Sequence, residues 1–467
     1  MASSLGRNST NTATPTKATF AYWLKGADDG TAQGIWGWHR GNDAANYWLG
    51  VYFSTNGSMY FNWKQGGSYA TIRGTSQKFR DPTAWGQHVI TIDTTLATAA
   101  DRVKWFYNGE RITSFEDSSY TVAQNATITN WSNSSDKLEI GTFYQSSTAK
   151  DLSTNSSITD FHFCDGYAYE ASSFGSVNAT SGIWVGNTSP SVSYGSQGEY
   201  IKFEDSSNLG LDSSGNTNNM AVSGTLTQNV DTPDNNFATW NPVNYVQANN
   251  SPVFSNGNTK MNGTHDAPYP NAISTLGIPK SGKYYAEFKN VGTQGFAIGI
   301  CDIPKGMEAL RTASTQIYNT TFNGAVSLKN DGSVIRNGTE TNSVTPTIAQ
   351  NDIVMIAYDA DNGAFYAGRN GTWGTVGGVV GVPTSGSSKT GAIDISAQSW
   401  FTTSTDQGFL VGSTSSGGYA IVEANFGNGY FGTTAVTSAG TGASTPGTFE
   451  YDVPTGYQPL TTKGLNL

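Results

Sequence analysis

Short runs of apolar and aromatic residues alternate with turn-forming residues along most of the chain. Each run has the length of a strand and mixes β-branched with aromatic side chains; examples are 20–24, 47–53, 58–63, 88–93 and 102–107. Asn108-Gly109, directly after the last of these, supplies the positive φ angles of a tight hairpin. No stretch of about 12 residues keeps apolar side chains at helical spacing. The pattern predicts an all-β protein built from antiparallel sheets.

The strand pattern is interrupted once near the middle of the chain. It fades near Phe174-Gly175, and a stretch rich in Asn, Pro, Ser and Gly at 246–270 precedes its return at Gly282. We therefore predict two antiparallel β-sandwich (jelly-roll-like) domains in tandem, at 17–175 and 271–467, with an extension and linker at 176–270. Residues 1–16 are polar and contain Pro15. They predict an N-terminal arm that is either disordered or ordered only against a partner subunit.

Charge and composition exclude several classes of function. Lys and Arg number 25 against 35 Asp and Glu, which gives a net charge of −10 without any basic cluster, so we expect no nucleic acid partner. No run of about 18 apolar residues occurs, so we expect no membrane insertion. The 12 Trp, 23 Tyr and 22 Phe can fill real cores, unlike the composition of a disordered chain. A folded protein without a nucleic acid or membrane partner is expected.

Two ordered sets of motifs resemble known families. The first half, from 16–25 through 101–109 and 158–163 to 166–175, resembles the concanavalin A-like (laminin-G-like) sandwich in structural proteins of marine tailed bacteriophages. The second half resembles a SPRY (B30.2-like) sandwich, in motifs such as Gly282-Lys-Tyr-Tyr-Ala-Glu-Phe288, Arg369-Asn-Gly371 and Pro454-Thr-Gly-Tyr457. Together the two resemblances cover most of the chain.

The resemblance implies a non-enzymatic virion structural protein displayed on the particle surface, as a capsid decoration, a head fibre or a tail fibre. Its expected partners are other virion proteins of the capsid or tail and surface glycans of the host or the environment. We also expect a homo-oligomer, such as a trimer, made in the host cytoplasm and released by lysis. Two alternatives stay open: a glycan-degrading depolymerase and a secreted lectin.

The sequence offers no catalytic constellation. A retaining glucanase needs two carboxylates on one strand face, and the pattern Glu-x-Asp-x-x-Glu is absent. None of the four histidines lies near a nucleophile elbow Gly-x-Ser-x-Gly. We therefore predict no catalytic residues. A depolymerase would need catalytic carboxylates that come from separate strands, and this alternative stays open.

One aromatic and polar segment is a candidate for sugar binding, which needs rings that stack on a pyranose and amide or carboxylate groups beside them. Trp36 and Trp38 are two positions apart and share one face of a strand. That face is either exposed, where the rings could stack on a sugar, or part of the sandwich core. Three polar residues follow within the same segment: Asn42, Asp43 and Asn46.

A second candidate lies in the C-terminal half. Arg369-Asn-Gly-Thr-Trp373 reads as a loop with an aromatic tip, and SPRY domains commonly bind partners through such loops. The sequence therefore adds Arg369 and Trp373 to the candidate binding residues.

A polar loop is the candidate for an ion. Asp212, Asn216 and Asn218 lie close enough to converge on Ca²⁺, which prefers hard oxygen ligands in flexible loops. The alternative is a loop held by Asx turns through its own side-chain hydrogen bonds. No cofactor is predicted other than this structural calcium.

Overall fold

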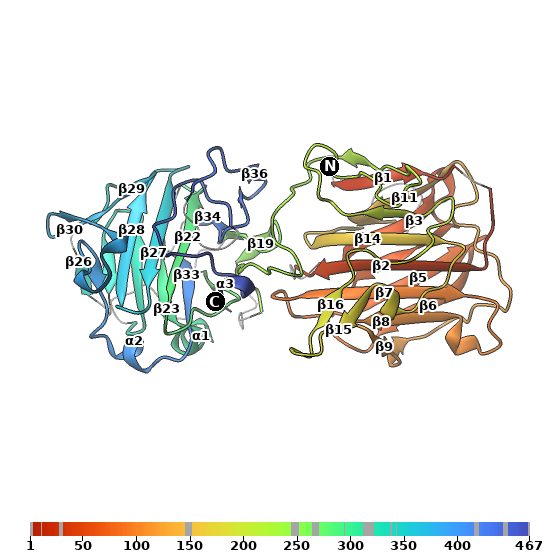
Figure 1. Cartoon of the computed structure of the whole chain (residues 1–467), viewed down its shortest axis with the longest axis horizontal. Coiled ribbons are helices and arrows are strands. Elements are labelled where there is room, and N and C mark those ends of the chain that lie inside the picture. The colour runs from red at the N-terminus through yellow and green to blue at the C-terminus, as the bar shows by residue number, and fades with distance from the viewer. Residues whose placement is uncertain are drawn as a thin grey trace. The chain divides into compact units, whose positions relative to one another are not determined.

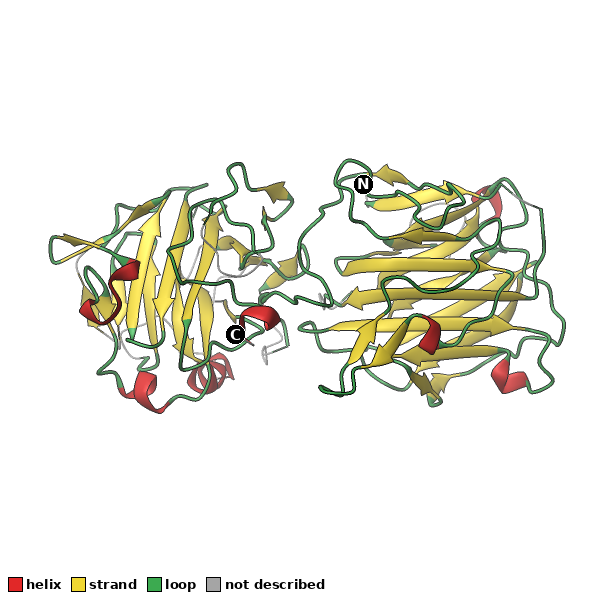
Figure 2. Ribbon diagram, in the orientation of Figure 1, coloured by secondary structure: helices red, strands yellow, loops and turns green. Residues whose placement is uncertain are grey.

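The computed structural model describes residues 3–10, 12–27, 31–144, 152–243, 252–263, 270–293, 295–311, 322–336, 339–341, 343–414, 420–441 and 447–465. Figure 2 shows that strands dominate and helices are few and short. The all-β prediction is confirmed. The chain divides into two compact units, Met1–Gln228 and Asn229–Leu467. Their boundary lies inside the segment 176–270 that the sequence indicated as extension and linker.

Unit 1 contains two large antiparallel sheets (Figure 1). In order across the first sheet lie β10 (Phe115–Asp117), β6 (Ser68–Thr75), β5 (Met59–Gln65), β4 (Trp48–Phe53), β3 (Gln33–Arg40), β11 (Asp136–Ile140), β1 (Ser4–Asn8) and β18 (Ala221–Ser223). Across the second lie β17 (Glu199–Ile201), β14 (Ser157–Asp165), β2 (Lys17–Lys25), β7 (Trp85–Asp93), β8 (Val103–Tyr107) and β9 (Glu110–Ile112). Two small hairpins pair β12 (Thr142–Phe143) with β13 (Leu152–Ser153), and β15 (Gly175–Val177) with β16 (Trp184–Gly186).

The core of unit 1 lies between the inner faces of these two sheets. Alternate residues of each strand point inward, as strand geometry requires. On the first sheet the inward set is large and apolar, and on the second sheet it includes several more aromatic rings; the cluster contains Trp36, Trp38, Leu49, Val51, Phe61, Trp63, Phe20, Tyr22, Ile90, Trp105 and Phe163. Phe20 stacks on Trp36 from the opposite sheet with ring centroids 4.3 Å apart. The aromatic content thus builds a sandwich core.

The N-terminal segment differs from its prediction. Residues 4–8 form β1, which pairs with β11 through Leu5 and Ile140 and with β18 on its other side. Leu5 is buried in the core, and Arg7 Nε donates to Glu199 Oε2 at 2.6 Å. The expectation of an arm that is disordered or ordered only by a partner subunit is therefore wrong for these residues, because this unit itself satisfies their backbone groups.

Unit 2 also contains two large antiparallel sheets (Figure 1). The first holds β19 (Val253–Ser255), β20 (Lys260–Asn262), β34 (Ile421–Asn425), β22 (Lys283–Asn290), β27 (Ile353–Asp359), β28 (Ala364–Arg369) and β29 (Thr372–Trp373), with β32 (Ile393–Asp394) also paired to β28. The second holds β21 (Asn271–Ile273), β33 (Gln407–Ser413), β23 (Phe296–Asp302), β24 (Ala325–Lys329), β25 (Val334–Arg336) and β26 (Thr339–Thr341).

Short elements complete both units. In unit 2 these are the hairpins β30 (Thr375–Val376) with β31 (Val379–Val380) and β35 (Tyr430–Phe431) with β36 (Thr434–Ala435), and the helices α1 (Ile303–Arg311), α2 (Ser399–Thr403) and α3 (Thr462–Leu465). The 3₁₀ turns are η1 (Gly41–Asp43), η2 (Ala99–Asp101), η3 (Ala171–Ser173) and η4 (Pro383–Ser388). No helix among the described residues is long and apolar enough to cross a membrane.

Candidate functional site

The outer face of the first sheet of unit 1 carries the most distinctive set of side chains. On β4, Leu49 and Val51 point into the core, so Trp48 and Tyr52 point outward. On β5, the residues of outward parity are Tyr60, Asn62 and Lys64. The register pairs Tyr52 with Tyr60, and Trp48 with Lys64. Aromatic and polar groups therefore alternate across neighbouring strands on a face that lies opposite the core.

Glycines form the floor of this face. A Cβ atom at Gly34, Gly37 or Gly50 would lie within 2.4 Å, 3.0 Å or 2.8 Å, respectively, of an atom of Phe143. The Phe143 ring can therefore lie directly on β3 and β4 only because these positions lack side chains. A Cβ at Gly74 on β6 would lie 2.4 Å from the Tyr60 ring, so Tyr60 lies flat across that strand in the same way.

Rings continue across the glycine floor in a nearly parallel series. Phe143 and Tyr52 have centroids 5.3 Å apart and planes inclined by 26°. Tyr52 and Tyr60 follow at 5.3 Å and 15°. Phe143 is buried, whereas Tyr52 and Tyr60 are half-exposed. The result is an offset-stacked series of rings in which Tyr52 and Tyr60 are partly exposed.

Two further tyrosines extend this surface toward the strand ends. Tyr69 on β6 contacts Trp48 edge to face at 5.4 Å and stacks with Tyr120 at 5.2 Å. Tyr120 is 55% exposed and has φ of 62°, a left-handed conformation that is rare for a bulky residue. Backbone strain of this kind accumulates at functional sites. We call Tyr52, Tyr60, Tyr69 and Tyr120 the tyrosine platform.

Polar groups lie among the platform rings. The amide oxygen of Asn62 and the indole N–H of Trp48 are buried and have no hydrogen-bond partner among the described residues. Buried polar groups are rarely left unpaired, so each such group calls for an explanation, and ligand recognition is one. Lys64 Nζ lies 5.3 Å from the Tyr69 ring centroid. The face therefore carries a cation beside its rings and two buried polar atoms without partners among the described residues.

Glu116 forms a polar rim at the other end of the platform. The Tyr60 hydroxyl donates to Glu116 Oε1 at 3.0 Å, and Lys78 Nζ donates to its Oε2 at 2.6 Å. The hydrogen bond from Lys78, with others from Ser58 and Asn56, lowers the pKa of Glu116 to about 2. Partial burial and the Glu116 charge raise the pKa of Tyr60 to about 12. Tyr60 thus stays a neutral, oriented phenol at neutral pH.

Trp36 and Trp38 are not part of an exposed site. Both are 0% exposed and belong to the core cluster. Their shared face is the inner one, because it opposes the second sheet, so the prediction that they stack on a sugar is wrong and the core alternative holds. Gly34 and Gly37 lie on the outer face of the same strand, where Phe143 packs on them. For this reason β3 contributes no aromatic ring to the platform.

The polar residues after Trp38 lie in the turn between β3 and β4. Asn46 Nδ2 donates to Asp43 Oδ1 at 2.7 Å, and the Asn46 and Tyr47 N–H groups donate to the Asp43 carbonyl. Asp43 and Asn46 therefore stabilise this turn, which adjoins the β5–β6 turn through a hydrogen bond from Gly67 N–H to the Asn46 carbonyl. The side chain of Asn42 lies outside the described residues.

Arg369 and Trp373 flank a tight hairpin turn in unit 2. Asn370 and Gly371 both have positive φ, as a two-residue turn between β28 and β29 requires. Arg369 Nε pairs with Asp352 Oδ2 at 2.8 Å, and Trp373 leans back onto Tyr285 at 6.4 Å. Trp373 is half-buried on the sheet rather than exposed at a loop tip, and the two side chains do not converge on a common site.

The Asp212 loop has the hydrogen bonds of Asx turns. Asp212 accepts four hydrogen bonds of 2.8–2.9 Å, from three backbone N–H groups and the Ser214 hydroxyl. The side-chain amides of Asn216 and Asn218 donate to the Gly198 carbonyl at 2.9 Å and 2.8 Å. In the described part of the chain, no three His, Cys, Asp or Glu side chains are arranged to hold a metal ion. The loop is satisfied by its own groups, which supports the Asx-turn alternative over the calcium site.

Sequence reasoning missed the platform, although a signal was present. Along β4 and β5, successive residues point to opposite faces of the sheet, and both faces carry large side chains. Only one of the two faces also carries Gly50, Asn62 and Lys64. A face that mixes glycine, amide and charge with aromatic rings is not a core face. That contrast identifies the outer parity and, with it, Tyr52 and Tyr60.

Comparisons with known proteins give distant similarities of fold. No protein-family model matches the chain, and no curated protein matches its sequence. Among solved structures, the SPRY domain of human HERC1 is 15% identical, with 40% of this chain and 96% of that chain covered and a TM-score of 0.29. Mouse laminin alpha1 domains LG4-5 are 9% identical, with 90% and 84% covered and a TM-score of 0.30. A SAP-like pentraxin of Limulus polyphemus is 11% identical, with 40% and 93% covered and a TM-score of 0.27.

Proposed function

We propose that the protein is a non-enzymatic carbohydrate-binding protein whose ligand lies on the tyrosine platform of unit 1. Half-exposed, nearly parallel rings can contact the apolar face of a pyranose, and their phenol groups can hydrogen-bond its hydroxyls. The observation that carries the proposal is the stacked pair Tyr52 and Tyr60 on a floor of glycines. Glycines at these positions keep the rings flat and accessible, which a purely structural sheet face does not require.

We further propose that this protein is a bacteriophage virion component displayed on the particle surface, as a capsid decoration, a head fibre or a tail fibre. The support is the resemblance of the ordered motifs in both halves to such structural proteins. Its partners would then be other virion proteins and host or environmental glycans, in a homo-oligomer such as a trimer. Immunogold labelling of purified virions with an antibody against residues 280–467 tests this role, and virions without label would contradict it.

Glycan-array binding of the full chain tests the platform directly. We expect Tyr60→Ala to lower affinity for any bound glycan by about tenfold, because one stacking contact is worth about 1 kcal/mol or more. The matched control is Tyr167→Ala, since Tyr167 is 43% exposed and belongs to a different part of unit 1. Equal binding by both variants and the unaltered protein would contradict the proposed site.

The same preparations separate binding from depolymerisation. A binding protein leaves its polysaccharide intact, whereas a depolymerase with carboxylates from separate strands releases reducing ends. Release of reducing sugar that is abolished by Glu116→Gln would replace the present proposal with the enzyme alternative. We expect bound polysaccharide of unchanged length.

A further inference from the structure

Lys64 occupies the centre of a cross-strand row on the outer face of unit 1. The register places it opposite Trp48 on β4 and opposite Tyr69 on β6. The Trp48 and Tyr69 rings contact each other at 5.4 Å, and the Lys64 ammonium lies 5.3 Å from the Tyr69 centroid. A cation held against an aromatic face is thus built into the platform.

The Lys64 ammonium has no acidic partner in the described part of the chain. On the same outer face, Lys78 pairs with Glu116 at 2.6 Å and Lys137 pairs with Glu139 at 2.9 Å. No carboxylate of the described residues lies within 4.0 Å of Lys64 Nζ. Lys64 is thus a half-buried cation without an acidic partner among the described residues, in a chain of net charge −10. Its three N–H donors lie beside the Tyr69 ring of the platform.

The position of Lys64 restricts the chemistry of the ligand. An ammonium at the edge of a stacking surface gains a charge-assisted hydrogen bond from a carboxylate of the sugar and only an ordinary one from a hydroxyl. Repulsion from the net negative protein falls off over a Debye length of about 8 Å at physiological salt, whereas the contact with Lys64 is direct. Local pairing therefore dominates over the overall charge.

We propose that the platform selects acidic polysaccharides. This proposal rests on the carbohydrate site proposed above. A sugar ring stacks on Tyr52 and Tyr60, and the carboxylate of a uronic acid residue farther along the polysaccharide pairs with Lys64 Nζ, because Lys64 lies four positions, about 13 Å, from Tyr60 along β5. Lys64 is then the residue that determines specificity, while Tyr52 and Tyr60 provide the stacking that any hexose shares.

Two matched probes test the assignment: a β-1,4-linked mannuronate hexasaccharide and β-1,4-linked mannohexaose, which differ in a carboxylate or a hydroxymethyl group at C6. Calorimetry of the full chain should show preference for the mannuronate. Lys64→Gln should lower affinity for it by about three- to tenfold and affinity for mannohexaose by a clearly smaller factor. Lys64→Arg should retain the preference, because the charge is kept. Lys104→Gln is the control, since Lys104 pairs with Glu170 on the other sheet and its loss changes the net charge equally.

The outcomes separate the two proposals. If Lys64→Gln binds both hexasaccharides as the unaltered protein does, or if the unaltered protein binds mannohexaose at least as well, the acidic preference is overturned while the carbohydrate site stands. If the unaltered protein binds neither probe, and Tyr60→Ala changes no entry of the glycan array, both proposals fail. Loss of mannuronate binding equally in Lys104→Gln would assign the effect to net charge and overturn the role of Lys64.

Discussion

The two units present aromatic rings on the outer face of their first sheets, yet only one of these faces is open. In unit 1, Tyr52 and Tyr60 are half-exposed. In unit 2, Tyr285 on β22 and Tyr366 on β28 have the same outward parity and are 0% and 2% exposed. The residue type and the strand geometry are alike. The difference lies in what covers the rings.

Residues 447–458, which we call the cover segment, lie across the outer face of unit 2. Phe449, Val453 and Tyr457 pack with the outward tyrosines in one buried cluster. Phe449 contacts Tyr285 edge to face at 4.9 Å, and the Tyr457 hydroxyl donates to the Pro383 carbonyl at 3.0 Å. The cover segment converts a potential binding surface into a second core.

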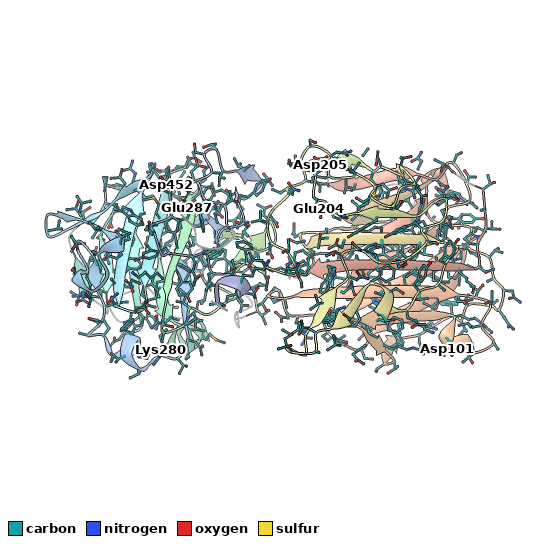
Figure 3. The ribbon with its side chains drawn as sticks, viewed as in Figure 1. Asp101, Glu204, Asp205, Lys280, Glu287 and Asp452 are labelled. Atoms are coloured by element: carbon teal, nitrogen blue, oxygen red, sulfur yellow. The ribbon has the colours of Figure 1, made fainter. Side chains whose placement is uncertain are left out.

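A buried carboxylate fastens the cover segment to the sheet. Glu287, labelled on β22 in Figure 3 near the marked Asp452 of the cover segment, accepts hydrogen bonds from the Glu450 and Tyr451 N–H groups at 2.8 Å and 2.9 Å. The Tyr285 hydroxyl donates to it at 2.9 Å. Burial raises the pKa of Glu287 to about 7, although these hydrogen bonds oppose the rise.

The comparison shows that outward aromatic residues alone do not define a binding site. In unit 2, rings and a carboxylate are used to hold a chain segment, so Trp373 beside them is part of a packed cluster. In unit 1, the rings pack against glycines and Tyr52 and Tyr60 are half-exposed. Accessibility, rather than composition, distinguishes the candidate site.

The largest expected effect comes from removing a ring of the cover segment. Phe449→Ala should lower the free energy of unfolding of unit 2 by about 3–5 kcal/mol, because it leaves a cavity in a buried cluster. Tyr60→Ala in unit 1 should cost about 1 kcal/mol, since its ring is half-exposed. Hydrogen exchange of peptides from each unit, measured against denaturant concentration, gives both values. Similar losses in the two units would remove the distinction between a covered and an open face.

The next effect is a pH dependence of unit 2 that originates at the cover segment. The pKa of Glu287 is raised from 4.5 to about 7, so its protonated form is favoured in the folded state. The stability that it contributes is complete below pH 4.5 and is lost as the pH rises through about 7. We expect unit 2 to lose up to about 3 kcal/mol between about pH 5 and about pH 8. Unfolding midpoints of unit 2 across this range provide the measurement.

Glu287→Gln supplies the control for this pH dependence. The amide cannot ionise, so unit 2 should become less stable overall but lose its dependence on pH in this window. Unit 1 is an internal reference, because burial raises the pKa of Glu199 to about 7 there too, against the opposing effect of Arg7. A pH dependence of unit 2 that persists in Glu287→Gln would assign it to another group.

The sequence predicted the architecture far better than the site. Period-two alternation and Asn-Gly turns depend on local sequence, so the all-β tandem arrangement could be predicted. Which parity faces the core depends on the opposite sheet, and for this reason Trp36 and Trp38 were assigned to a candidate site. The burial of Tyr285 depends on residues more than 160 positions away, such as Tyr451, which donates to the neighbouring Glu287. Contacts at such separation leave no periodic signal along the chain.

A smaller effect is expected from filling the glycine floor. Gly74→Ala places a Cβ 2.4 Å from the Tyr60 ring, which must tilt away from β6. Because the ring can move toward solvent, we expect a stability loss of about 1 kcal/mol but a tenfold or so lower affinity for glycan. Gly26→Ala is the control, since its Cβ would meet Phe53 at an ordinary 3.6 Å. Calorimetry on both variants decides, and unchanged binding by Gly74→Ala would show that flatness of Tyr60 is not needed.

The smallest effect on stability, with a clear effect on binding, is expected at Tyr120. Its φ of 62° disfavours a bulky residue, whereas Asn tolerates this conformation. In Tyr120→Asn the relief of strain offsets the lost stacking on Tyr69, so the free energy of unfolding should change by less than about 0.5 kcal/mol. Affinity for glycan should fall by about threefold, because a ring that is 55% exposed is lost from the platform. A stability loss above about 1 kcal/mol with unchanged affinity would make Tyr120 a structural residue. In that case the stacking of Tyr120 on Tyr69 stabilises the fold by more than the backbone strain costs.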